Sequence, residues 1–343
     1  MQRCLELALK GAGNVAPNPM VGAVLVYENR IIGEGWHQQY GGPHAEVHCI
    51  ASVKPEDQPL IAASTMYVSL EPCAHFGKTP PCSNLIIEKQ IPKVVIGCRD
   101  PFPQVNGKGV ERLQSAGVKV VMPVLEKECR ELNKRFFTYH KEQRPYIILK
   151  WAQTADGFIG SADHKRLLIS NEFSNRMVHQ WRSEEMAIMV GTNTALLDNP
   201  RLTNRHGSGP QPVRVVVDRK LRLPNTLQLF QPGLKTIILN EAKEEVVDHL
   251  HYVLLSKGGR PAEQIAAALH SENIQSVLIE GGAALLQSFI DAGLWDEARV
   301  IMNTQLKVQD GVKAPMIREA DLLSEMQLGS DKIQFFKKPF VEN

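Results

Sequence analysis

Several features that define whole classes of protein are missing from this chain of 343 residues. It has no run of about 18 apolar residues, the minimum for a membrane-spanning helix. Lysine and arginine total 39 against 37 aspartates and glutamates, so the basic excess of a nucleic-acid-binding protein is absent. The first residues are charged and do not form a signal peptide. We therefore expect a cytoplasmic protein with neither a membrane nor a nucleic-acid partner.

Cysteine is absent after Cys129, although the chain contains 6 cysteines. This distribution excludes a disulfide framework that spans the whole chain. In a reducing compartment, unevenly placed cysteines indicate metal ligands or buried thiols. Most isolated cysteines are small core residues. We expect buried thiols at four positions: Cys4, Cys49, Cys98 and Cys129.

The length of the chain exceeds what one hydrophobic core usually serves, so two domains are expected. A proline disfavours helix at the residue before it, and Arg144 precedes Pro145 after a polar helical stretch. We place the boundary there, with domains 1–144 and 145–343. In both, apolar runs of strand length alternate with helical patterns, which predicts two α/β domains.

The first domain is predicted to contain a hairpin, three more strands and several helices. Its strands are 21–27, 30–36, 65–70, 93–97 and 118–122, and its helices are 82–90, 107–116 and a polar helix, 126–141. The second domain is predicted to contain strands 146–152, 187–190, 213–218, 236–240, 276–280 and 298–303, with helices 171–183, 261–270 and 283–292.

The strongest functional signal is His44-Ala45-Glu46, followed after a strand by Cys73 and Cys82. One imidazole and two thiolates supply three of the four positions that tetrahedral zinc prefers and leave one open for water, as in catalytic sites. Zinc lowers the pKa of bound water, and a carboxylate must then carry protons to the leaving group. The motif predicts zinc bound by His44, Cys73 and Cys82, with Glu46 as the catalytic proton carrier.

Two other interpretations of these residues stay open. A zincin motif needs a glutamate directly after the first histidine, and here Glu46 is one position late, although His48 remains a candidate ligand. A closed structural zinc site would recruit Cys49 or His75 as a fourth ligand. In that case Glu46 would be only a surface charge.

These residues resemble the cytidine and deoxycytidylate deaminase superfamily, whose pattern is His-x-Glu followed by Pro-Cys-x-x-Cys. Here eight residues, Ala74 to Pro81, separate the cysteines where two are typical. That longer loop resembles the bacterial riboflavin-biosynthesis deaminase, as do the segments 16–23 and 100–109. The resemblance implies a cytidine deaminase-like α/β/α sandwich. It also implies that Asn18, His75 and Lys78 bind the pyrimidine and its ribose phosphate.

The second domain has no Gly-x-Gly-x-x-Gly after a strand, so a Rossmann dinucleotide site is not expected. Instead the apolar strand 276–280 runs into Gly281 and Gly282, which open a helix. Backbone amides at a helix start can hold a phosphate, and glycine lets the ligand approach closely. A plain strand-to-helix turn is the alternative interpretation.

The segments 150–157, 190–203 and 280–282 resemble the reductase half of the bifunctional riboflavin-biosynthesis enzyme, which has a dihydrofolate reductase-like fold. The resemblance implies an NADPH site at Gln153, Leu168, Ser170, Thr194, Asp198, Gly281 and Gly282. It implies a site for the substrate at Lys150, Arg166, Arg182, Leu202, Arg205 and Glu280. For Arg182, a solvated charge on an outward helix face is the alternative.

Together these patterns predict a bifunctional enzyme of riboflavin biosynthesis with one zinc ion and NADPH. It would deaminate a phosphorylated pyrimidine and then reduce the ribosyl chain of the product. A deaminase of free nucleosides or tRNA is one rival hypothesis, and an inactive zinc-stabilised binding module is another. The sequence leaves a homo-oligomer open.

Overall fold

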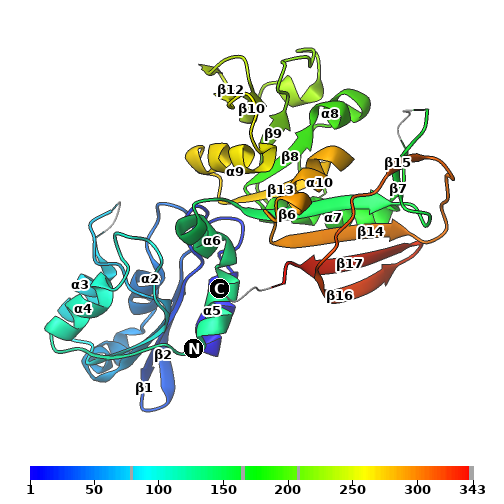
Figure 1. Cartoon of the computed structure of the whole chain (residues 1–343). Coiled ribbons are helices and arrows are strands. Elements are labelled where there is room, and N and C mark those ends of the chain that lie inside the picture. Colours follow the sequence, from blue (N-terminus) through cyan, green and yellow to red (C-terminus); the bar gives the residue numbers. More distant parts are fainter. Residues whose placement is uncertain (78–79, 164–166, 207–208, 340–343) are drawn as a thin grey trace. The chain divides into compact units, whose positions relative to one another are not determined.

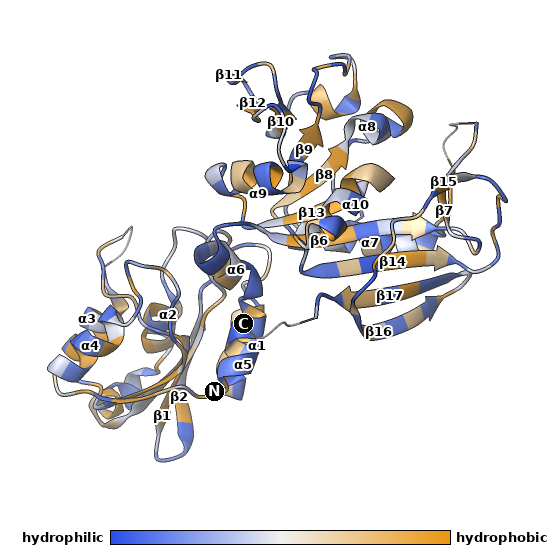
Figure 2. Cartoon of the chain, in the orientation of Figure 1, coloured by the Kyte–Doolittle hydropathy of each residue, from blue (hydrophilic) through white to orange (hydrophobic). Residues whose placement is uncertain are grey.

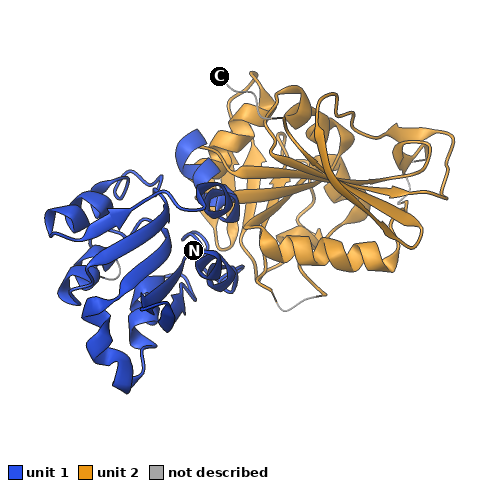
Figure 3. Ribbon diagram, turned by 90° about the horizontal axis from the view of Figure 1, so that it is seen from below, with its two compact units in different colours: residues 1–142 blue, residues 143–343 orange. Residues whose placement is uncertain are grey.

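The computed structural model describes residues 1–77, 80–163, 167–206 and 209–339. The chain divides into two units, Met1–Glu142 and Gln143–Asn343 (Figure 3). Arg144, the expected end of the helical stretch, is the second residue of the second unit, and Pro145 separates it from β6 (Tyr146–Gln153). Among the described residues, no helix combines the length and apolarity needed to cross a bilayer.

A five-stranded sheet, in the order β2-β1-β3-β4-β5, forms the centre of the described part of the first unit. The first two strands form the predicted hairpin, and Glu28 and Asn29 between them have φ values of 44° and 65°, as a two-residue turn requires. Every predicted strand matches its observed bounds to within one residue. These bounds are β1 (Gly22–Tyr27), β2 (Arg30–Trp36), β3 (Thr65–Leu70), β4 (Lys93–Cys98) and β5 (Lys119–Val121).

Helices cover both faces of this sheet, which confirms the α/β/α sandwich. One face is covered by α2 (Ala45–Ala51), α3 (Cys82–Glu88) and α4 (Lys108–Ser115). The other is covered by α1 (Gln2–Leu9), α5 (Glu126–Leu132) and α6 (Lys134–Glu142). A 3-10 helix, η1 (Pro55–Ala63), precedes β3. The four predicted buried thiols, Cys4, Cys49, Cys98 and Cys129, are all 0% exposed.

The single helix predicted over residues 126–141 is wrong, because the chain breaks into α5 and α6 at Asn133. The Asn133 side chain accepts a hydrogen bond from the Met20 N–H at 2.8 Å and donates one to the Met20 carbonyl at 2.9 Å. These two hydrogen bonds, the Asn133 clamp on Met20, join segments that are far apart in the sequence. A polar helical pattern carries no sign of such a tertiary contact.

A ten-stranded sheet runs through the described part of the second unit, in the order β11-β12-β10-β9-β8-β13-β6-β14-β17-β16 (Figure 1). Its centre is parallel and contains all six predicted strands. Besides β6 these are β8 (Ala187–Gly191), β9 (Val213–Val217), β10 (Thr236–Asn240), β13 (Ser276–Gly281) and β14 (Glu297–Asn303). Figure 2 shows β8 and β9 as mostly hydrophobic, as expected of strands buried on both faces.

The strands toward the edges of this sheet and a separate two-stranded pair lie outside the sequence predictions. They are β7 (Phe158–Ser161), β11 (Glu245–Val247), β12 (Leu250–Leu254), β15 (Gly311–Lys313), β16 (Asp321–Leu328) and β17 (Asp331–Lys337). β16 shows the reason, because it is exposed along almost its whole length. An exposed strand need not alternate apolar with polar residues, so its sequence gives no strand signal.

Helices lie on both faces of the large sheet. Side chains that alternate along each strand pack against the helices of one face or the other. Ile147 and Leu149 of β6 belong to the core on one face, whereas Tyr146 and Ile148 belong to the core on the other. The first face carries α9 (Pro261–Ser271) and α10 (Ala283–Asp291). The second carries α7 (Glu172–Glu184), α8 (Thr192–Asp198) and the 3-10 helix η2 (Gln228–Phe230).

Candidate functional site

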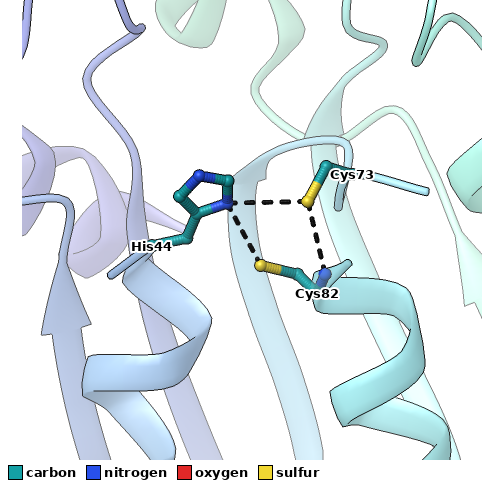
Figure 4. Close-up of side chains that lie close together, drawn as sticks. All are labelled: His44, Cys73 and Cys82. Atoms are coloured by element: carbon teal, nitrogen blue, oxygen red, sulfur yellow. Dashed lines mark hydrogen bonds between the residues drawn. The ribbon is translucent and has the colours of Figure 1, made fainter. Parts of the chain in front are cut away.

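Three side chains with metal-ligating atoms converge in the first unit (Figure 4). The Nδ1 atom of His44 lies 3.5 Å from the Cys73 sulfur and 3.3 Å from the Cys82 sulfur. All three ligand atoms lie within 4.8 Å of one another. Tetrahedral zinc, with bonds of about 2.0–2.3 Å to nitrogen and sulfur, separates its ligand atoms by roughly 3.5–3.8 Å. The donor set and its spacing therefore fit zinc.

Two helix starts and one loop position these ligands. His44 has an extended backbone and caps α2, so its side chain projects from the end of that helix. Cys82 is the first residue of α3, and its N–H donates a hydrogen bond to the Cys73 sulfur at 3.3 Å. A hydrogen bond from the Cys82 thiol lowers the pKa of Cys73 to about 4. Cys73 is thus ready to act as a thiolate, the form that binds zinc.

Glu46 lies in the first turn of α2, two residues after His44, and is only 3% exposed. Burial raises the pKa of its carboxyl group. It also interacts with the Cys82 thiol, so it is next to the ligand cluster. If the zinc site were closed and structural, Glu46 would be a surface charge, but its carboxylate is buried. A buried carboxylate beside an open metal site is suited to carry protons.

The alternative ligands do not join the cluster. In the described part of the chain, the only group of metal-ligating residues is His44 with Cys73 and Cys82. Cys49 lies on the buried face of α2 and is completely enclosed in the core. The His75 ring packs against Phe102 at a centroid distance of 5.9 Å. One of the four zinc positions therefore receives no ligand from the described residues.

Glu71, two residues before Cys73, supports the loop that carries this ligand. Its buried carboxylate accepts four main-chain hydrogen bonds, from the N–H groups of Asp100, Gly107, Gly109 and Val110 at 3.0–3.3 Å. A side chain at Gly109 would place its Cβ 2.0 Å from the Pro72 carbonyl oxygen. The sequence contained the signal, Glu71-Pro72-Cys73, but only the cysteine was assigned a role.

We expect Glu71→Ala to weaken zinc binding and lower the melting temperature. Each buried N–H left without an acceptor costs about 1–3 kcal/mol, and four would lose theirs together. Zinc release to a chromogenic chelator and thermal denaturation would measure both effects. Glu126→Ala is the matched control, because Glu126 is partly exposed and pairs with Arg130 one helical turn away. Unchanged zinc retention in Glu71→Ala would show that the loop does not depend on this carboxylate.

The predicted substrate residue Asn18 hydrogen-bonds to a histidine that the sequence analysis missed. His37 is 2% exposed, and its ring stands edge-on to that of His44 at 5.4 Å. Its Nδ1 lies 2.9 Å from the Pro43 carbonyl and its Nε2 lies 3.0 Å from the Asn18 amide nitrogen. Since Nδ1 must donate to the carbonyl, Nε2 accepts from the Asn18 NH₂ group. No motif surrounds His37, so only the fold reveals this arrangement.

The other two predicted substrate residues of the first unit belong to the loop between the cysteines. The Nδ1 atom of His75 is buried and has no hydrogen-bond partner among the described residues. A buried polar atom of this kind is usually satisfied by a ligand or an ordered water. Lys78 lies outside the described residues.

In the second unit, the predicted cofactor residues follow the carboxyl ends of neighbouring strands. β8, β13 and β6 are adjacent and parallel, so their carboxyl ends meet at one edge of the sheet. Ligands of open parallel sheets bind at this edge. Gln153 ends β6, Thr194 lies in the helix that follows β8, and Gly281 ends β13.

The glycine turn forms a close cradle with Thr194. A Cβ added to Gly281 would lie 2.8 Å from the Thr194 methyl carbon, and Gly282, with φ of 86°, immediately precedes α10. A side chain at Gly281 would therefore clash with Thr194. This observation fits a dinucleotide phosphate held at the start of a helix.

The remaining predicted cofactor residues differ in their surroundings. The Gln153 side-chain amide oxygen accepts a hydrogen bond from the Trp151 indole N–H at 2.8 Å. Asp198 lies at the exposed end of α8, and Leu168 is 76% exposed. Ser170 is half-buried and directly precedes Asn171, the N-cap of α7. The structure thus brings Thr194, Gly281 and Gly282 into contact, with Gln153 on the adjacent strand.

Three predicted substrate residues of the second unit form a buried charged cluster. Arg182 of α7 donates to both carboxylate oxygens of Glu280, at 2.7 and 2.5 Å. Arg182 is only 13% exposed, so it is not the solvated charge of the alternative interpretation. Burial alone would raise the pKa of Glu280, but the Arg182 guanidinium holds it below its ordinary value. Burial lowers the pKa of Lys150, which also lies near Glu280.

Two other predicted substrate residues of the second unit, Leu202 and Arg205, lie in the loop after α8. Arg205 is exposed. Leu202 is 2% exposed and packs in the core beneath α8, with φ of 51°. Its side chain is therefore occupied by packing, and only its main chain can reach a ligand. Arg166 lies outside the described residues.

Comparison with known proteins bears on both units. Residues 1–98 match the cytidine and deoxycytidylate deaminase zinc-binding region, and residues 145–306 match the RibD C-terminal domain. The riboflavin biosynthesis protein RibD of Aquifex aeolicus is 38% identical over 98% of this chain and 97% of its own length. The chain belongs to the RibD family. The order of the two domains is therefore the one that the sequence resemblance predicted.

Solved RibD structures agree with this assignment. A Thermotoga maritima protein described as a diaminohydroxyphosphoribosylaminopyrimidine deaminase and 5-amino-6-(5-phosphoribosylamino)uracil reductase is 36% identical, with a TM-score of 0.87. It covers 99% of this chain, and this chain covers 97% of it. Acinetobacter baumannii RibD is 31% identical with the same TM-score, 0.87, over 99% of this chain and 98% of its own. The chain therefore combines a cytidine deaminase-like domain with a dihydrofolate reductase-like domain.

Proposed function

We propose that this RibD protein catalyses two successive steps on one phosphorylated pyrimidine. The first is hydrolytic deamination of 2,5-diamino-6-ribosylamino-4(3H)-pyrimidinone 5′-phosphate. The second is NADPH-dependent reduction of the ribosyl chain, which yields 5-amino-6-ribitylamino-uracil phosphate. The observation that carries the proposal is the cluster of His44, Cys73 and Cys82 beside buried Glu46, in a chain whose second unit has the glycine cradle.

In the deamination step, His44, Cys73 and Cys82 would hold zinc, which when bound supplies an activated water at neutral pH. Glu46 would take one proton from the attacking water and deliver it to the leaving amine. The C–N bond then breaks, ammonia departs, a carbonyl replaces the amino group, and the second water proton ends on the adjacent ring nitrogen. Burial keeps this proton from exchanging freely with solvent. The His37 bond orients the Asn18 amide, which would read one edge of the ring.

Lys78 and His75 would bind the rest of the first substrate, the ribose phosphate. An ammonium group neutralises a phosphate, and the buried Nδ1 of His75 supplies a further polar contact. For each residue the assignment depends on the family resemblance together with its side-chain chemistry.

In the reduction step, bound NADPH would supply a hydride to the open-chain imine of the ribose. The turn at Gly281 and Gly282 with Thr194 would hold a cofactor phosphate. The other proposed contacts with the cofactor are made by Gln153, Leu168, Ser170 and Asp198. The chain's contribution is mainly to hold the two reactants in contact, since effective concentration accounts for much of such a rate enhancement.

The substrate of the reduction step would lie against the charged cluster of Arg182, Glu280 and Lys150. The bidentate Arg182–Glu280 pair holds both side chains in a fixed orientation, which supports this assignment. Arg205 would supply a guanidinium to the phosphate, and Arg166 and the main chain of Leu202 would complete the site.

The proposal predicts that purified, zinc-loaded protein oxidises NADPH when the diamino pyrimidinone ribosyl phosphate is added. Oxidation requires prior deamination, so one absorbance trace tests both steps and their order. Ammonia release without NADPH oxidation would reject the reductase assignment. Release of ammonia from cytidine or tRNA, but not from this substrate, would favour the rival deaminase. Absence of both signals would favour the inactive binding module.

A further inference from the structure

His179 is a buried histidine for which the two proposed steps provide no role. It lies on α7 one turn before Arg182 and is 4% exposed. Its Nδ1 accepts a hydrogen bond from the main-chain N–H of Arg205 at 3.1 Å. The acceptor must be a deprotonated nitrogen, so the ring proton is on Nε2.

The His179 ring also lies close to the Arg205 side chain, but this second contact is not a hydrogen bond. The Nε2 atom of His179 lies 3.4 Å from a terminal nitrogen of the Arg205 guanidinium. Both groups are then donors, so they do not hydrogen-bond to each other. The main-chain bond is therefore the one by which His179 holds Arg205. The ring is also braced edge-on by His206 at a centroid distance of 4.7 Å.

The loop that carries Arg205 is tied to α7 at two places. Arg182 donates to the Thr203 carbonyl at 3.2 Å, and His179 accepts from Arg205 two residues later. The neighbouring residue, Asn204, is held by the Gln211 side-chain amide. The amide oxygen accepts from the Asn204 main-chain N–H at 2.9 Å, and the amide NH₂ donates to the Asn204 carbonyl at 2.8 Å. The direction in which the Arg205 side chain leaves the loop thus depends on the bond to His179.

The surroundings of His179 keep its ring neutral. Burial, followed by the nearby charges of Arg182 and Arg205, lowers the pKa of His179 to about 4. His206 acts in the same direction and Glu280 in the opposite one. A neutral ring retains the lone pair on Nδ1 that accepts the Arg205 N–H at physiological pH.

We propose that His179 is a positioning residue of the reductase step, which holds Arg205 in place to bind the phosphate of the substrate. This inference rests on the proposed function of the second unit. It predicts that loss of the Nδ1 acceptor weakens binding of the phosphorylated substrate without weakening binding of NADPH.

The test compares His179→Leu with His179→Asn in the full chain, with the deaminated phosphorylated intermediate as substrate. Leucine removes the acceptor, whereas the asparagine side-chain oxygen lies close to where Nδ1 was. We expect His179→Leu to raise the KM for the intermediate about tenfold, from the loss of one buried hydrogen bond. The KM for NADPH and kcat should change little, and His179→Asn should restore most of the affinity.

Two further measurements separate positioning from a structural role. Hydrogen–deuterium exchange at the Arg205 amide should quicken in His179→Leu and slow again in His179→Asn. In a double-mutant cycle with Arg205→Ala, the two KM effects should be strongly non-additive, because both act through one side chain. Ammonia release by the first unit of the same chain serves as the control for folding.

Several outcomes would overturn the inference. Equal rises in the KM for NADPH and for the intermediate would show general damage to the site, and additive effects in the cycle would show that His179 does not act through Arg205. The wild-type chain is assayed first. Failure of the wild type to oxidise NADPH would reject the proposed function itself, whereas an active wild type with an unchanged KM in His179→Leu rejects only the positioning role.

Discussion

Glu46→Gln should abolish ammonia release while zinc remains bound. Glutamine keeps the size and most of the polarity of the side chain but cannot carry a proton. Positioned acid–base groups contribute about 10²–10⁴-fold to a rate, so a loss of that size is expected. The three ligands are unchanged, and glutamine keeps a polar side chain of the same size beside the Cys82 thiol that Glu46 contacts. An ammonia assay on purified protein, with zinc content measured on the same sample, tests the prediction.

Two controls make the Glu46 experiment specific. The variant should still oxidise NADPH when it is given substrate that has already been deaminated, because the reductase is a separate unit of the chain. Glu56→Gln is a matched substitution on an exposed carboxylate of the same unit and should leave both activities intact. Ammonia release within a few fold of wild type in Glu46→Gln would mean that another group moves the proton.

Arg182→Met should both destabilise the second unit and abolish reduction. The pair with Glu280 is bidentate and nearly excluded from water, with exposures of 13% and 6%. Removing one member of a buried ion pair typically costs about 3–5 kcal/mol, because the other charge is left without a partner. Denaturant unfolding monitored in the second unit and the NADPH assay measure the two effects. Deamination and zinc content should stay at the wild-type level.

A second variant separates stability from function at this pair. Replacing both residues, as in Arg182→Met with Glu280→Met, removes the uncompensated carboxylate and should recover much of the lost stability, since burial already favours the neutral form of the nearby Lys150. Reduction should not return, because in the proposed site the substrate binds to these charges. Arg260→Met is the control, since its ion pair with Glu263 is exposed and such pairs contribute little to stability. Recovery of reduction in the double variant would exclude the pair from the substrate site.

The sequence alone determined the features that depend on local chemistry. The zinc ligands and Glu46 are recognisable because metal binding and proton transfer require particular residue types at short spacings. The central strands of both sheets are recognisable because burial on both faces demands continuous apolar runs. The glycine turn after β13 is recognisable because a close backbone approach tolerates no side chain.

Only the tertiary structure decided which distant residues meet. Arg182 and Glu280 are 98 positions apart, and the Asn133 clamp on Met20 spans 113. The four N–H groups on Glu71 and the bonds of His37 and His179 likewise depend on how separate elements pack. Such contacts leave no periodic pattern, because a hydrogen bond between two elements constrains one residue in each. Local patterns therefore located the chemistry of this protein, and packing decided how its groups are held.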